Sequence, residues 1–220
     1  RTLNELMRAN RAAPRSIHYH AGENESHTVT YGDLHDRALG YLHHLQQLGA
    51  RPGDHLILLL NSNEHFIETF WAAVLGGIVP VPVAVGISDE HRHKLLRIAG
   101  KLGNPFICSD HRTLDRVAAF AANSGDPEAA PTCASLLSRA FFPEDIRDVS
   151  RPGTAHEARP EDIAFIQFSS GSTSDPKGVV LTHGQMAFVV TNHLADLMPG
   201  TTERDASLVV APLSHGAGVH

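Results

Sequence analysis

The residues with the clearest chemical potential lie in one stretch, Phe168–Gly178, which reads F-S-S-G-S-T-S-D-P-K-G. Its hydroxyl groups and main-chain N–H groups can donate hydrogen bonds to phosphate oxygens, and its first glycine allows the backbone to approach a ligand closely. Lys177 adds a compact positive charge. We therefore predict that the stretch binds a polyphosphate. The residues expected to contact the phosphates are Ser169, Ser170, Gly171, Ser172, Thr173, Lys177 and Gly178.

An apolar run, Ile163–Phe168, comes directly before this polar stretch. Uninterrupted apolar runs of this length are typical of buried parallel strands. A second apolar segment, Val179–Leu181, follows, so the polar stretch is expected to form a loop held between two strands. Open α/β sheets bind ligands at the carboxyl ends of their strands, which is where this loop would lie.

The spacing of the stretch excludes a Walker A loop, because G-x-x-x-x-G-K-[ST] needs a second glycine where this chain has Pro176. The stretch closely resembles instead the signature loop of the adenylate-forming superfamily. That superfamily comprises acyl-CoA synthetases, fatty acyl-AMP ligases and the adenylation domains of peptide and polyketide synthases. Its usual form is Ser/Thr-Ser-Gly-Ser/Thr-Thr-Gly-x-Pro-Lys-Gly. Ser174 stands where a glycine is more common, so a positive φ there would be strained and the tip of the loop is expected to differ.

The resemblance extends over most of the chain. It includes T-Y-G-D-L from Thr30, P-G-D from Pro52 and G-G-I-V-P-V-P-V from Gly76. It implies an α/β fold of mainly parallel βαβ layers, in which residues 1–220 form a partial N-terminal, AMP-binding domain. The rest of that domain and the C-terminal domain, with its adenylation lysine, would lie outside this chain. The 220 residues alone are therefore expected to be inactive.

The activity implied by the resemblance is ATP-dependent activation of a carboxylic acid. The carboxylate attacks the α-phosphorus of ATP, which gives an acyl-adenylate and pyrophosphate, and the acyl group then passes to a thiol. Such a displacement depends on positioning and on neutralising charge on the leaving pyrophosphate. Thr173 and Lys177 are expected to act on the β- and γ-phosphates, with Mg²⁺ bridging the phosphate oxygens.

A second motif, P-L-S-H-G-A-G-V-H from Pro212 to His220, follows an apolar run, Ser207–Ala211, that is predicted to be a strand. The glycines beside His215 would let its side chain project toward a ligand. In the resembling family a histidine or aromatic residue here borders the acyl pocket, so His215 is expected near the reacting carboxylate. Amino-acid-activating domains usually carry an aspartate nearby, and residues 216–220 have none. This favours an acid without an α-amino group.

Three functions remain open from the sequence. The first is activation of a fatty or aryl acid and its transfer to the phosphopantetheine thiol of an acyl carrier protein, as in fatty acyl-AMP ligases and the loading domains of polyketide or peptide synthases. The segment P-V-A-V-G-I-S-D-E-H-R, from Pro82, resembles that branch. The second is the same adenylation with coenzyme A as the acceptor. The third is a non-catalytic nucleotide-binding module.

Apolar strands and amphipathic helices are predicted to alternate along the chain, as in a βαβ fold. Helices are predicted at 3–12, 34–48, 66–74, 88–102, 113–122 and 185–198. Strands are predicted at 16–20, 27–30, 56–60, 78–85, 105–109, 163–168, 179–181 and 207–211. Thr30, Ser88 and Thr182 are predicted N-caps. Residues 123–162 are predicted to be a loop-rich connection with one short helix.

The composition excludes several other classes of protein. The formal net charge of -6 at pH 7 and the pI near 6.2 give no basic surface for nucleic acid. A chain of 220 residues, 42% of them apolar, can bury roughly 70% of its unfolded surface without disulfides or a metal. Phe70–Ile87 is uncharged, but glycines and prolines interrupt it, so no membrane span is predicted.

The cysteines and histidines do not indicate a metal site. Cys108 is predicted in the core and Cys133 in a loop, and two cysteines suit a reducing cytoplasm. None of the sixteen histidines has the i, i+4 spacing of H-E-x-x-H. They are interpreted as surface residues, except His215 and His183, for which a local structural role is predicted.

Overall fold

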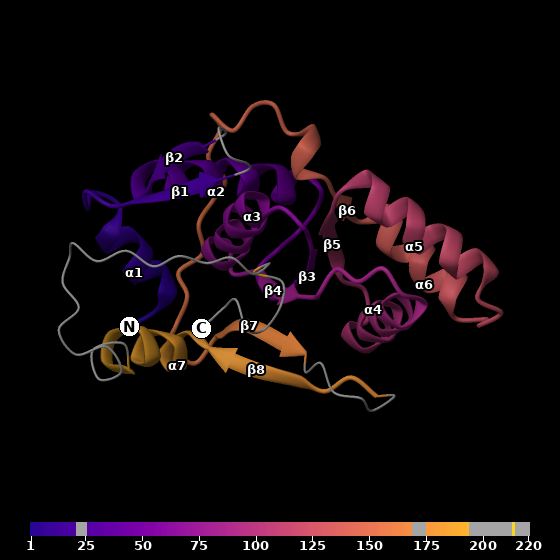
Figure 1. Ribbon diagram of the computed structural model, residues 1–220. Helices are drawn as coiled ribbons and strands as arrows, with labels where there is room; N and C mark the ends of the chain where they lie inside the picture. The colour runs from indigo at the N-terminus through magenta and orange to yellow at the C-terminus, as the bar shows by residue number, and fades with distance from the viewer. Residues whose placement is uncertain (21–25, 169–174, 194–212, 214–220) are drawn as a thin grey trace.

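The computed structural model of the 220-residue chain describes residues 1–20, 26–168, 175–193 and 213. A parallel four-stranded sheet lies at its centre (Figure 1), and its order is β4-β3-β5-β6. The strands are β3 (His55–Leu59), β4 (Val79–Pro82), β5 (Phe106–Ser109) and β6 (Ala140–Phe141).

Helices connect successive strands of this sheet. They are α3 (Asn63–Leu75) between β3 and β4, α4 (Asp89–Leu102) between β4 and β5, and α5 (His111–Asn123) with α6 (Ala129–Ser138) between β5 and β6. A helix between parallel strands is what a βαβ crossover requires. The predicted α/β fold of mainly parallel βαβ layers is confirmed.

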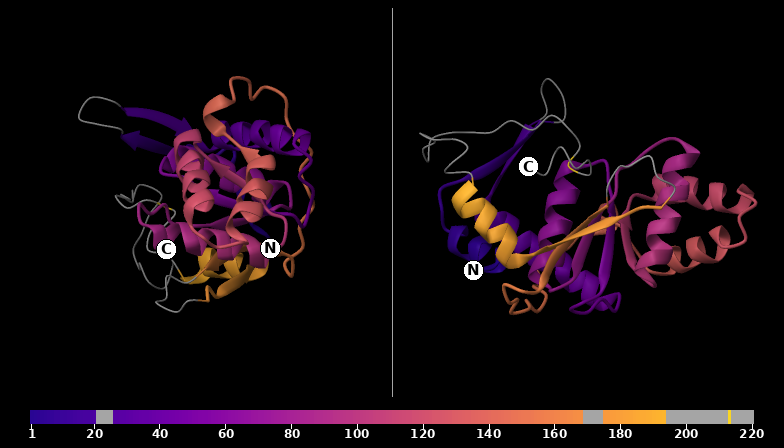
Figure 2. Two further views of the ribbon diagram at one scale, coloured as in Figure 1. Left: turned by 90° about the vertical axis from the view of Figure 1, so that its right-hand side faces the viewer. Right: turned by 90° about the horizontal axis from the view of Figure 1, so that it is seen from below.

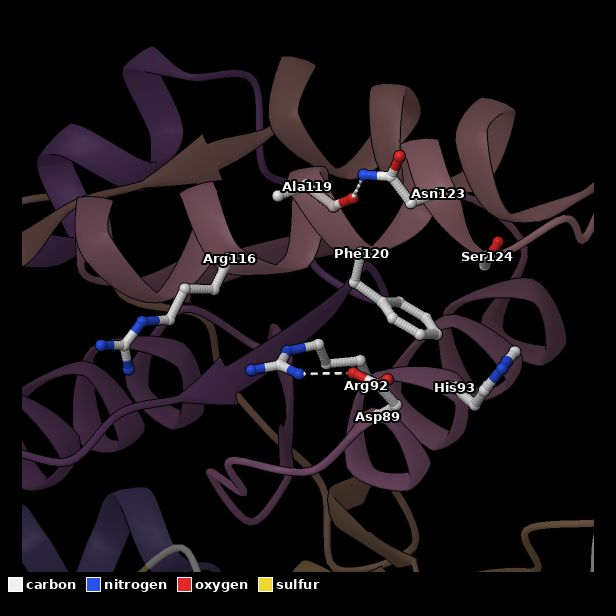
Figure 3. Close-up of a pocket in the computed structure, with 8 residues that line it drawn as sticks. All are labelled: Asp89, Arg92, His93, Arg116, Ala119, Phe120, Asn123 and Ser124. Atoms are coloured by element: carbon white, nitrogen blue, oxygen red, sulfur yellow. Dashed lines mark hydrogen bonds and ion pairs between the residues drawn. The ribbon is translucent and has the colours of Figure 1, made fainter.

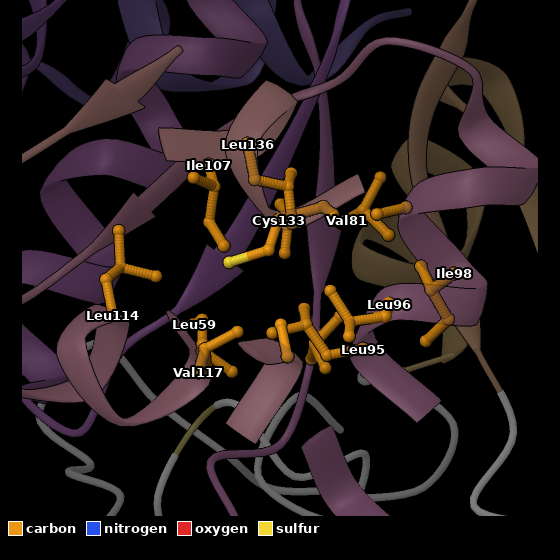
Figure 4. Close-up of a cluster of buried hydrophobic side chains, with 14 of the residues drawn as sticks. Leu59, Val81, Leu95, Leu96, Ile98, Ile107, Leu114, Val117, Cys133 and Leu136 are labelled. Carbon is orange, nitrogen blue, oxygen red and sulfur yellow. The ribbon is translucent and has the colours of Figure 1, made fainter. Parts of the chain in front are cut away.

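The two faces of the sheet are covered by different helices (Figures 1 and 2). Because successive side chains of a strand point to opposite faces, Ile57 and Ile107 pack against α4, α5 and α6, as Figure 4 shows for Ile107. Leu56, Leu58 and Phe106 pack against α3 and α2 (Tyr31–Gln47). Each such side chain contributes roughly 1.5–3 kcal/mol by its burial. Cover on both faces explains why these strands are continuously apolar.

The N-terminal elements agree with the predictions. Helix α1 (Leu3–Asn10) precedes an antiparallel hairpin of β1 (Ser16–His20) and β2 (Ser26–Thr30). The side chain of Thr30 accepts from the backbone N–H of Asp33, which starts α2 with a capping box. Ser88 precedes α4 as predicted, but its side chain makes no capping hydrogen bond.

The strands β7 (Ile163–Phe168) and β8 (Gly178–Thr182) pair antiparallel in a separate two-stranded sheet. The prediction that residues 163–168 form a parallel strand is therefore wrong. Ala164 and Phe165 are buried against α1 and α3, and Ile166 packs with the side chains of the α4 layer. Burial of these three residues on both sides of β7 produces an apolar run, whatever the direction of the partner strand.

The connection predicted to be loop-rich with one short helix, residues 123–162, contains that helix and also a short strand that was not predicted. Helix α6 covers the sheet and β6 extends it beyond β5. Cys133 is buried on the inner side of α6, so its assignment to a loop is wrong, whereas Cys108 lies in the core as predicted. A short helix with one apolar side gives a weak sequence signal, and packing against the sheet stabilises it.

Helix α7 (His183–Phe188) is capped by Thr182, whose side chain accepts from the backbone N–H of Gln185 as predicted. It continues as a π-helix, Val189–His193. The helix predicted at 185–198 is confirmed as far as the structure describes it, and the strand predicted at 207–211 lies outside the described residues. Among the described residues, none of the helices is both long and apolar enough to span a bilayer.

Candidate functional site

The hydroxyl-rich loop connects β7 to β8 at the end of their hairpin next to α4 (Figures 1 and 2). Because β7 ends at Phe168 and β8 begins at its register partner Gly178, the two strands predicted to flank the hydroxyl-rich stretch are confirmed. Most of its predicted phosphate contacts lie outside the described residues, as does His215 on the second motif. The loop residues concerned are Ser169, Ser170, Gly171, Ser172 and Thr173.

The structure describes the part of the loop that enters β8. Pro176 is buried, while Asp175 and Lys177 are exposed. The ammonium Nζ of Lys101, on α4, lies 2.7 Å from Oδ1 of Asp175. This hydrogen bond, aided by the positive charges of Lys177 and Arg97, holds the pKa of Asp175 below its usual range. The entry to β8 is therefore tied to α4 by an ion pair.

Gly178 fixes how closely the two strands approach each other at the base of the loop. A Cβ at this position would lie 3.0 Å from Cγ2 of Ile166 and 3.1 Å from Cζ of Phe168. Both distances are shorter than ordinary van der Waals contact. The motif glycine therefore has a packing role here besides its predicted role in phosphate binding.

The other end of β8 is held by His183. Its Nδ1 accepts a hydrogen bond of 3.3 Å from the backbone N–H of Leu3, and its own backbone N–H donates to the carbonyl of Asp162 at 3.0 Å. The side chain is buried, and burial lowers its pKa, so that the neutral form is favoured. The predicted structural role of His183 is confirmed, since it joins α7 to α1.

Two cavities formed by described residues are lined by no residue of β7 or β8. One, of about 580 Å³, lies between α4 and α5 (Figure 3). There Arg92 donates to Asp89 at 2.7 Å, and the ring of His93 meets the ring of Phe120 edge-on at 4.7 Å. The other, of about 590 Å³, lies between β2, α2, α3 and residues 147–150.

The described residues also contain no cluster of three or more His, Cys, Asp or Glu side chains suited to a metal ion.

The parallel sheet covered on both faces, followed by an antiparallel hairpin, defines an α/β protein. Residues 6–220 match the AMP-binding enzyme family. The chain therefore belongs to that family.

Named relatives and solved structures agree with this assignment. A feruloyl-CoA synthase of an Amycolatopsis species is 28% identical over 212 residues, which cover 95% of this chain and 39% of the relative. The long-chain-fatty-acid–AMP ligase FadD26 of Mycobacterium marinum is 26% identical over 201 residues, covering 87% of this chain and 32% of the relative. The structure of McyG A-PCP complexed with phenylalanyl-adenylate is 29% identical, with a TM-score of 0.81, and the match covers 98% of this chain and 38% of that one. The chain thus spans about two fifths or less of the length of these three proteins.

Proposed function

We propose that the complete protein containing this chain activates a fatty or aryl carboxylic acid as an acyl-adenylate and transfers the acyl group to the phosphopantetheine thiol of an acyl carrier protein. One observation carries this proposal. The sequence S-S-G-S-T-S-D-P-K-G, from Ser169, connects two paired strands in a chain of the AMP-binding enzyme family. ATP would be the second substrate, with Mg²⁺ bound to its phosphates.

The loop would act by positioning ATP and by neutralising charge. Its hydroxyls and main-chain N–H groups would donate to the β- and γ-phosphates, and Lys177 would stabilise the charge that develops on the leaving pyrophosphate. Lys177 is exposed at the start of β8, so its ammonium group is accessible to a ligand. The hydroxyls proposed to donate belong to Ser169, Ser170, Ser172 and Thr173.

The decisive variant is Lys177→Ala in the complete protein, assayed by exchange of radioactive pyrophosphate into ATP. Loss of one contact to transition-state charge typically costs about 2–4 kcal/mol, so we expect exchange to fall roughly 30- to 900-fold. Because Lys177 is exposed, the fold should be unaffected. An unchanged exchange rate would refute the role of the loop. ATP binding by the unsubstituted protein without any exchange would favour the non-catalytic nucleotide-binding module.

The acid is proposed to lack an α-amino group. Residues 216–220, next to His215, offer no aspartate to receive an ammonium group. The names of two relatives point the same way, since one is a feruloyl-CoA synthase and another a long-chain-fatty-acid–AMP ligase, whereas the McyG structure contains phenylalanyl-adenylate. Pyrophosphate exchange with fatty, aryl and amino acids tests this proposal. We expect His215→Ala to raise the KM for the acid more than the KM for ATP.

The acceptor is the least constrained part of the proposal. A carrier protein is favoured by the resemblance of the segment from Pro82 to fatty acyl-AMP ligases and loading domains. Coenzyme A is the alternative, and the name of the feruloyl-CoA synthase supports it. Offering the preformed acyl-adenylate to a phosphopantetheinylated carrier protein and to coenzyme A separates the two by the thioester that forms.

The residues from 1 to 220 alone are proposed to be inactive. They match at most two fifths of the three relatives described above, and the missing parts would bind the adenine and the ribose and supply the C-terminal lysine of the family. The purified piece should therefore form no acyl-adenylate with any acid of the panel. Measurable product would contradict the proposed domain organisation.

A cytoplasmic location is proposed from the two free, buried cysteines.

A further inference from the structure

Helix α4 carries three basic residues on the side that faces the loop end of the β7–β8 hairpin. Lys94, Arg97 and Lys101 are spaced three and four residues apart, so they project from one face of the helix. In Figures 1 and 2, α4 lies beside the loop end of the hairpin. The residues of α4 that line the cavity in Figure 3 are Asp89, Arg92 and His93, in the first turns of the helix, and none of the three basic residues is among them.

Lys101 makes the direct contact between this basic face and the loop. Its Nζ lies 2.7 Å from Oδ1 of Asp175, and both side chains remain partly exposed, at 43% and 67%. Arg97, one turn earlier on α4, and Lys177, two residues later in the loop, add positive potential at the same carboxylate. Asp175 thus pairs with Lys101, and the charges of Arg97 and Lys177 favour its ionised form.

The position of Asp175 poses an electrostatic problem for a phosphate-binding loop. A carboxylate beside a triphosphate repels it, since like charges at close range disfavour each other. The same carboxylate also attracts Lys177, which the loop needs for the phosphates. Pairing with Lys101 offsets the first effect and reduces the second, because the carboxylate already has a partner on α4.

We propose that Lys101 is a positioning residue for ATP: by pairing with Asp175 it fixes the loop against α4 and leaves Lys177 available to the phosphates. This inference rests on the proposed function. It assigns a role in ATP binding to a residue of α4 that lies outside the phosphate loop. Lys101 itself makes no contact with the reacting atoms in this scheme.

The test is a double-variant cycle in the complete protein, with the KM for ATP and the KM for the acid measured separately by pyrophosphate exchange. Lys101→Met keeps the length of the side chain and removes its charge. We expect it to raise the KM for ATP about two- to fivefold, the range that an exposed ion pair usually contributes, and to leave the KM for the acid unchanged. Lys101→Arg should retain the KM of the unsubstituted protein, since it preserves the charge.

The cycle is closed with Asp175→Asn, which removes the carboxylate that Lys101 neutralises. In that background, Lys101→Met should have no further effect on the KM for ATP, because the ion pair is already absent. The effect of Lys101→Met alone should also shrink at high salt, since screening weakens an exposed pair. Arg116→Met, on the exposed face of α5, makes the same change in net charge and is expected to leave both KM values unchanged.

The outcomes separate this inference from the proposed function. If Lys177→Ala abolishes exchange but Lys101→Met leaves the KM for ATP unchanged, the inference is wrong and the proposed function stands. Equal effects of Lys101→Met and Arg116→Met, or additive effects of Lys101→Met and Asp175→Asn, also overturn the inference. If Lys177→Ala does not lower exchange, the proposed function itself fails. Thermal unfolding by circular dichroism confirms that each exposed variant is folded.

Discussion

At Gly178 the two strands of the hairpin approach too closely for a side chain. Gly178→Ala would place a methyl group 3.0 Å from Cγ2 of Ile166, so the neighbouring side chains must move by a few tenths of an ångström. We expect a loss of about 1 kcal/mol in the free energy of unfolding, measured by urea denaturation. Because the same residue opens β8 directly after the loop, pyrophosphate exchange by the complete protein should also fall.

Gly100 provides the matched control for this substitution. It lies inside α4, and a Cβ there would meet no atom within 4 Å. Gly100→Ala should therefore stabilise the protein by about 0.5–1 kcal/mol, because alanine loses less conformational entropy in a helix. Stabilisation by both variants would show that the strands at Gly178 separate at little cost.

At the scale of single residues, the sequence predicted the binding and capping residues that are recognised from residues close to them in the chain. The order of hydroxyls, glycine and lysine around Ser172 and Lys177 indicated phosphate binding, and the pattern of Thr30 and Asp33 indicated a helix start that the structure confirms. It gave no indication that Lys101 meets Asp175, because that contact depends on the packing of α4 beside the hairpin. The phosphate contacts of the loop stay predictions.

At the scale of elements, the packing of α2 against α3 includes a buried ion pair. Glu68, on α3, is fully buried and accepts from Nε and Nη2 of Arg37 on α2. Tyr41 also lies on α2. Burial, reinforced by the adjacent Glu68 carboxylate, raises its pKa. Arg37 thus compensates a charge that could not otherwise remain in the interior of the protein.

Removing Arg37 should destabilise the contact between these two helices. Arg37→Ala leaves the carboxylate of Glu68 buried without the cation that compensates its charge, and we expect a loss of about 3 kcal/mol in the free energy of unfolding. This is the lower end for a broken buried pair, because the side chain of Arg37 is 39% exposed and water reaches it. Adding Glu68→Gln should restore part of the loss by removing the unpaired charge.

An exposed pair on α1 and α2 serves as the comparison. Arg11 and Asp36 lie 2.8 Å apart, with both side chains more than half exposed. Arg11→Ala should therefore cost less than about 1 kcal/mol in the same urea experiment. Similar losses for Arg11→Ala and Arg37→Ala would contradict the special role of burial at Glu68.

The elements themselves were largely predictable, and the errors have physical causes. Helical spacing and capping residues predicted α2, and apolar runs predicted β3 and β5. The run at 163–168 was also correctly predicted as a strand, but an apolar run reports burial and not the direction of the partner, so its antiparallel pairing was missed. The short helix predicted within residues 123–162 is present as α6, but the two-residue strand β6 was missed, because its pairing with β5 depends on contacts distant in the sequence.

At the scale of the whole molecule, the alternation of strands and helices determined the class of fold but not the order of the strands. Parallel crossovers follow from helices of this length between strands. The strand order depends on which faces of the sheet the helices cover. In this order β3 lies between β4 and β5, and β6 extends the sheet. Two separate apolar layers, one with α2 and α3 and one with α4, α5 and α6, stabilise that order.

Two histidines, the buried His183 and the half-buried His55, should make the stability of the molecule depend on pH. Burial lowers the pKa of His55 at the start of β3 and of His183 at the start of α7, and the Nδ1 of His183 accepts from Leu3, which requires the neutral ring. In the unfolded chain both would titrate near pH 6.5. As the pH falls below about 6.5, the unfolded chain therefore takes up protons that the folded chain does not. The free energy of unfolding should be constant above about pH 7 and fall by up to about 1.4 kcal/mol per pH unit for each histidine below it.

His183→Gln tests this at one position, because glutamine can accept from Leu3 but does not titrate. Urea denaturation at pH 7 and at pH 5 should give a smaller difference in the free energy of unfolding for His183→Gln than for the unsubstituted protein. His111, whose pKa is raised by its hydrogen bond to Asp145, acts in the opposite direction but is exposed, so salt weakens its contribution. An equal pH dependence of the free energy of unfolding in both proteins would mean that the folded state does not disfavour protonation of His183. The contact of His183 with Leu3 would then not stabilise the packing of α1 on α7.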